Sequence, residues 1–108
     1  MLSNSEIAVF CEQSGMILES GLSMLEGILI MEADVEPQNT EYKRIYADIR
    51  TCLEETGIFY EALQKAGVFP DYVIQMAKLG EETGNLDVTM KGLAAYIYLS
   101  PVDYDSEI

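Results

Sequence analysis

Apolar residues recur every three to four positions along most of the chain, which is the spacing of an amphipathic α-helix. The stretch "SNSE" at residues 3–6 has the form of a capping box, in which Ser3 caps a helix and Glu6 reaches back to it. Gly21 closes this first helix. Five further helices are predicted over residues 22–33, 40–55, 58–66, from Pro70 to Gly80, and 85–99.

The same spacing predicts which side chains face inward. The expected inner faces are Leu22, Leu25, Ile28 and Leu29 in the second helix, Tyr42, Ile45, Tyr46, Ile49, Cys52 and Leu53 in the third, and Val73, Met76 and Ala77 in the fifth. No segment alternates with period two for long, and β-branched residues are dispersed. We therefore predict an all-α fold, a single six-helix antiparallel bundle over residues 1–99, followed by an acidic, irregular tail at 100–108.

The composition is that of a soluble globular domain. Hydrophobic residues make up 49% of the 108 residues, which suffices for the core of one domain. The longest apolar run, 27–31, is too short to span a membrane, and the first 42 residues lack the Lys or Arg of a secretory signal. The net charge of −13 disfavours nucleic acid binding, which needs clustered cations. On charge alone we interpret it as a contribution to solubility, although it would also attract a basic protein partner.

The residue types present disfavour an enzyme. Histidine is absent, which removes the usual general base and the commonest zinc ligand. No phosphate-binding P-loop motif occurs either. Cys11 and Cys52 match no metal or redox spacing, so we interpret them as small core residues with free thiols in a reducing compartment.

Three segments, in this order, resemble one protein family. They are "FCEQSGMILESGLSMLEGI" (10–28), "TGIFYEALQKAGVFPDYVIQM" (56–76) and "LGEETGNLDVTMKGLAAY" (79–96), the last with a Gly-Glu-x-x-Gly-x-Leu signature. Together they resemble the cytoplasmic domain of the bacterial type II secretion F protein, which inner-membrane platform proteins of type IV pili and competence pseudopili share. The resemblance covers residues 5–97. It implies a non-catalytic six-helix scaffold that relays work from a cytoplasmic assembly ATPase to growing pseudopilin fibres.

The resemblance also implies a location and partners. The expected location is the cytoplasmic face of the bacterial inner membrane, and the expected partners are the assembly ATPase and other inner-membrane components. Family members usually carry two such domains and several membrane helices. We therefore expect this chain to be a soluble part of a longer protein, attached to the membrane through segments that it does not contain. Ser23 stands where family members often have Pro, and it can cap the second helix instead.

The stretch "LGEETGNLD" places two acidic residues where the fifth helix is expected to end, although helix C-termini prefer cations. We expect Gly80 to end that helix, Asn85 to cap the sixth and the acids to serve the sixth helix's N-terminus. A functional alternative is a calcium site at Glu81, Asn85 and Asp87, which the resemblance also implies. Calcium takes six to eight oxygens, so three are too few alone. Glu82 is expected to point to solvent.

Apolar residues off the main stripes predict a second contact surface. Met16 and Met24, together with Tyr96 and Tyr98 near the end of the sixth helix, are its candidate residues. They motivate the prediction of a homodimer. The competing hypothesis is a free-standing acidic helical adaptor or calcium-binding module with no link to secretion.

Overall fold

The computed structural model describes residues 1–99, and the predicted tail at 100–108 lies outside the described residues. This part of the chain folds into six helices without strands, which confirms the all-α prediction. The helices are α1 (Asn4–Glu19), α2 (Met24–Asp34), α3 (Thr40–Thr56), α4 (Phe59–Ala66), α5 (Asp71–Thr83) and α6 (Leu86–Leu99).

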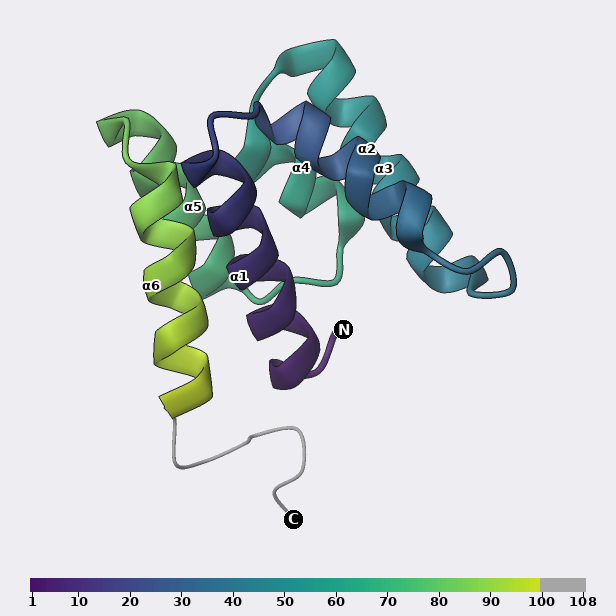
Figure 1. Cartoon of the computed structure of the whole chain (residues 1–108), viewed down its shortest axis with the longest axis horizontal. Helices are drawn as coiled ribbons and strands as arrows, with labels where there is room; N and C mark the ends of the chain where they lie inside the picture. The colour runs from purple at the N-terminus through teal and green to yellow at the C-terminus, as the bar shows by residue number, and fades with distance from the viewer. Residues whose placement is uncertain (100–108) are drawn as a thin grey trace.

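Each helix packs against the next one in the sequence, and α6 packs back against α1, so that the six helices form a closed ring of neighbours. The first and last helices lie side by side and run antiparallel, as do α2 and α3 (Figure 1). The α2–α3 pair runs at an angle to α1 and α6 (Figure 1). The molecule measures 39 × 36 × 22 Å, and its shortest dimension is about two helix diameters.

Capping boxes begin α1 and α2. The backbone N–H of Glu6 donates to the Ser3 hydroxyl (3.2 Å), and the Glu6 carboxylate accepts from the Ser3 N–H (2.9 Å). Ser23 and Glu26 repeat this arrangement at the start of α2. Both predicted caps are thus confirmed, and α2 begins at Met24 rather than at residue 22.

The inner face of α3 agrees with the prediction, whereas those of α2 and α5 differ from it. In α2 the buried residues are Met24, Gly27, Ile28 and Met31, and Leu29 is 46% exposed. This helix is apolar on nearly every side, so its spacing did not single out one face. In α5, Ile74 is buried with Val73 and Ala77, while Met76 is 40% exposed. The exposed Met76 leaves apolar surface that the core does not use.

Helices α1 and α6 approach closely at Gly15. A Cβ atom on Gly15 would lie 3.1 Å from the backbone N of Lys91 and 3.3 Å from the carbonyl oxygen of Asp87. The adjacent Ser14 is fully buried, and its hydroxyl has no hydrogen-bond partner within the described part of the chain. Small residues at this point let the two helix backbones come together.

Candidate functional site

The connection between α5 and α6 begins later in the sequence than predicted, because α5 does not end at Gly80. Gly80 lies inside α5, which continues through Glu81 and Glu82 to Thr83. The helix ends instead at Gly84, whose φ of 75° is the left-handed conformation that glycine adopts readily. The expected end at Gly80 was therefore wrong by one turn.

Gly80 is needed for packing rather than for a turn. A Cβ atom there would lie 2.7 Å from the Thr89 hydroxyl oxygen, 2.9 Å from the Thr89 Cβ and 3.2 Å from the Leu86 Cα. The Leu86 Cα is a backbone atom of α6 and the Thr89 Cβ is bonded directly to that backbone, so neither can easily move aside. The absence of a side chain at Gly80 thus allows α5 and α6 to pack this closely.

Glu81 caps α4, not α6, which corrects the prediction that the acids serve the following helix. Its two carboxylate oxygens accept hydrogen bonds from the backbone N–H groups of Phe59 and Tyr60, each at 2.7 Å. These N–H groups belong to the first turn of α4, where Ile58 at the cap position offers no side-chain hydrogen bond. An apolar residue directly before a helix was the signal in the sequence that the cap comes from elsewhere.

The other two predicted calcium ligands lie at the start of α6. Asn85 directly precedes the helix, its carbonyl accepting from the Thr89 N–H at 3.0 Å, and Asp87 lies in the first turn as predicted. Glu81 and Asp87 border the same surface hollow. Within residues 1–99, no three His, Cys, Asp or Glu side chains are grouped to hold a metal ion. Calcium binding stays a prediction, which melting with and without calcium measures.

An apolar groove lies along α5 and α6, close to the start of α1. Its volume is about 640 Å³, and it is lined by Asn4, Tyr72, Met76, Thr89, Gly92, Leu93, Tyr96 and Ile97. Tyr96 is 68% exposed, and Leu79 and Leu99 are further exposed apolar residues on the same two helices. No charged side chain is among the described residues that line this groove. We call this surface the α5–α6 face.

The predicted contact residues are only partly on this face. Tyr96 lines the groove, and Tyr98 is exposed near the end of the same helix. Met16 is 57% exposed on α1. Met24 is 8% exposed and belongs to the core, so its prediction as a contact residue is corrected. Its position at the start of α2, against the rest of the core, accounts for the burial.

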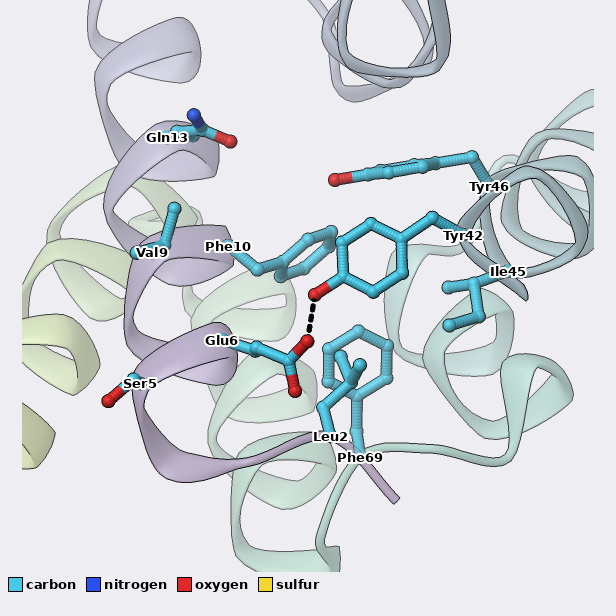
Figure 2. Close-up of a pocket in the computed structure, with 10 residues that line it drawn as sticks. All are labelled: Leu2, Ser5, Glu6, Val9, Phe10, Gln13, Tyr42, Ile45, Tyr46 and Phe69. Atoms are coloured by element: carbon cyan, nitrogen blue, oxygen red, sulfur yellow. Dashed lines mark hydrogen bonds between the residues drawn. The ribbon is translucent and has the colours of Figure 1, made fainter. Parts of the chain in front are cut away.

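A second pocket, of about 360 Å³, opens between α1 and α3. Figure 2 shows Glu6 and Tyr42 pointing toward each other across it, and the Tyr42 hydroxyl donates to the Glu6 carboxylate at 2.5 Å. This hydrogen bond, followed by the one from the Ser3 N–H, lowers the pKa of Glu6. Burial and the same hydrogen bond raise the pKa of Tyr42. Sequence periodicity gives no signal for this site, because its two polar residues are 36 positions apart.

Both cysteines are buried with free thiols, as predicted. Cys11 is fully buried, and burial raises the pKa of its thiol to about 12. Since the thiolate is the reactive form, Cys11 is a core residue and not a nucleophile.

Within residues 1–99, none of the helices has both the length and the apolar character needed to cross a bilayer.

Comparison with known proteins gives a consistent result. A family model described as "Type II secretion system (T2SS), protein F" matches residues 10–99. A type IV pilus assembly protein, PilC of Thermus thermophilus, is 30% identical over 92 residues, which cover 85% of this chain and 22% of that protein. The PilC of Myxococcus xanthus is 27% identical over 96 residues, covering 88% of this chain and 22% of the relative. The chain thus spans less than a quarter of the length of these relatives.

Proposed function

The chain belongs to the family of protein F of the type II secretion system, and from this premise we propose that it is a non-catalytic scaffold domain that works by contact. The machine would be an inner-membrane platform for type II secretion or type IV pilus assembly. The match to two PilC proteins, which are type IV pilus assembly proteins, supports this placement. The domain would lie on the cytoplasmic side of the inner membrane, attached through segments outside this chain.

The proposed partners are a second copy of this chain, the assembly ATPase and other platform subunits. The observation that supports a contact role is the α5–α6 face. It leaves Tyr72, Met76 and Tyr96 partly or largely exposed around a groove on two adjacent helices. Contiguous apolar surface of this kind commonly marks a protein interaction site. We assign it to self-association.

The charge of the chain predicts how this self-association depends on salt. Two copies each carry a formal net charge of −13, so their long-range interaction is repulsive. Salt screens this repulsion, whereas burial of the apolar face is not weakened by it. Added sodium chloride should therefore strengthen the dimer. A dimer held mainly by ion pairs would weaken instead.

Light scattering at tens of micromolar tests the assignment. The chain should have the mass of a dimer, and Tyr96→Ser should shift it toward the monomer. Ile30→Ser is the matched control, because Ile30 is also exposed and apolar but lies on α2, away from α6 (Figure 1). A monomeric parent chain, or equal loss of the dimer in both variants, would contradict self-association through this face.

A further inference from the structure

The pocket between α1 and α3 has walls made of aromatic rings from three parts of the chain. Phe10 comes from α1, Tyr42 and Tyr46 from α3, and Phe69 from the segment between α4 and α5. The ring centroids of Phe10 and Phe69 are 4.9 Å apart, and those of Tyr42 and Tyr46 are 6.3 Å apart with the rings nearly perpendicular. These contacts between rings hold the aromatic side chains in place around the pocket (Figure 2).

One carboxylate, that of Glu6, faces this largely apolar space. It is positioned by the Ser3 N–H at one oxygen and by the Tyr42 hydroxyl at the other. A carboxylate offers about four acceptor positions, so Glu6 can accept two further hydrogen bonds. The pocket therefore combines an oriented negative charge with aromatic walls.

The described residues provide no positive side chain for this carboxylate. Neither Lys nor Arg is among those that line the pocket, and residues 1–42 contain none. The nearest basic residues in the sequence are engaged elsewhere. Lys43 donates to the Glu32 carbonyl oxygen, and Arg44 pairs with Asp48 at 2.7 Å. Of the contributions that lower the pKa of Glu6, that of the Met1 amino group is the smallest.

We propose that this pocket receives an arginine side chain from a partner protein. A guanidinium is planar and weakly hydrated, so it can stack on a tyrosine or phenylalanine ring while donating two hydrogen bonds to one carboxylate. The pocket volume of about 360 Å³ is ample for one such side chain. The net charge of −13 attracts a basic partner to the same molecule. This site is separate from the α5–α6 face, so the proposal does not depend on self-association.

The test is a nuclear magnetic resonance titration of the isotope-labelled 108-residue chain with N-acetyl-arginine methylamide. The matched probe is the citrulline derivative, which has nearly the same shape but carries no charge. The arginine derivative should produce saturable shifts of amides around Ser5, Tyr42 and Phe69, with millimolar affinity. The citrulline derivative should bind more weakly, by a factor of about ten or more. No saturable shift with arginine, or equal shifts with both probes, would overturn the proposal.

Two variants separate binding from folding. Glu6→Gln removes the charge from the pocket but keeps a side chain that can complete the capping box with Ser3. Glu26→Gln makes the same change in the equivalent capping box of α2, which lies outside the pocket. Glu6→Gln should weaken binding of the arginine derivative about tenfold, and Glu26→Gln should leave it unchanged. Undiminished binding to a folded Glu6→Gln chain would also overturn the proposal.

Discussion

The carboxylate of Glu81 in α5 caps α4 at Phe59, accepting a hydrogen bond from the Phe59 backbone N–H at 2.7 Å. Its second oxygen accepts from the next N–H in α4 at the same distance. One side chain therefore satisfies two N–H groups that the helix itself leaves without partners. It also ties α4 to α5, and with α5 to the face that we assign to self-association.

Removing this cap should destabilise the domain. Glu81→Ala leaves the Phe59 and Tyr60 N–H groups without their acceptor in a partly buried setting, so we expect a loss of about 1–2 kcal/mol in unfolding free energy. Chemical denaturation monitored by circular dichroism measures it. Glu82→Ala is the control, because the adjacent Glu82 is exposed, and it should change stability by less than about 0.5 kcal/mol. Equal effects of the two substitutions would argue against the cap.

Glycine substitutions in the two helices of this face should have opposite effects. At Gly80 a Cβ would lie 2.9 Å from the Thr89 Cβ, so Gly80→Ala must push α5 and α6 apart and should lower stability by about 1–3 kcal/mol. At Gly92 a Cβ meets nothing within 4 Å, so Gly92→Ala should raise stability by up to about 1 kcal/mol through helix propensity. Thermal melting of both variants measures the difference. A stabilised Gly80→Ala chain would refute the close approach.

Glu6 should make the stability of the chain depend on pH in the acidic range. The Tyr42 hydroxyl and the Ser3 N–H lower its pKa in the folded state below the ordinary value of 4.5. The unfolded chain therefore binds this proton first, and the contribution of Glu6 is complete above pH 4.5. It is lost as the pH falls through the folded-state pKa. Glu6→Gln should flatten the decline of unfolding free energy below pH 4.5, and an unchanged decline would contradict the assignment.

The buried hydroxyl of Ser14 should be dispensable for stability. It has no hydrogen-bond partner among the described residues, so burying it carries a desolvation penalty without compensation. Ser14→Ala keeps a small side chain at the α1–α6 contact, and we expect it to raise the unfolding free energy by about 1 kcal/mol. Chemical denaturation of the variant checks this. A marked loss of stability would mean that the hydroxyl has a partner in solution.

Local signals in the sequence predicted the helices and most of their ends. The Ser3 capping box and the Ser23 cap act within a few residues, so their patterns can be read along the chain. Contacts between distant segments could not be predicted in this way. Glu81 was assigned to the nearer helix because nothing along the sequence connects it with Phe59.

The candidate sites show the same difference between local signals and contacts of distant segments. Tyr96 could be identified because it is apolar and off the inner face of an amphipathic helix, a property of one helix alone. The pocket between α1 and α3 could not, because the meeting of Glu6 with Tyr42 depends on how the two helices pack. Met24 was misassigned for the related reason that α2 is apolar on nearly every side.

Self-association through α5 and α6 can be tested by measuring a distance between two copies of the chain. A single nitroxide label replaces Leu99, three residues from Tyr96 and therefore on a neighbouring part of the α6 surface, or Leu29, on α2; both positions are exposed. Cys11 and Cys52 are buried and should not react with the label in the folded chain. Pulsed electron resonance at tens of micromolar should give a defined intermolecular distance that is shorter for the label at Leu99 than at Leu29. No intermolecular signal, or a shorter distance at Leu29, would contradict self-association through α5 and α6.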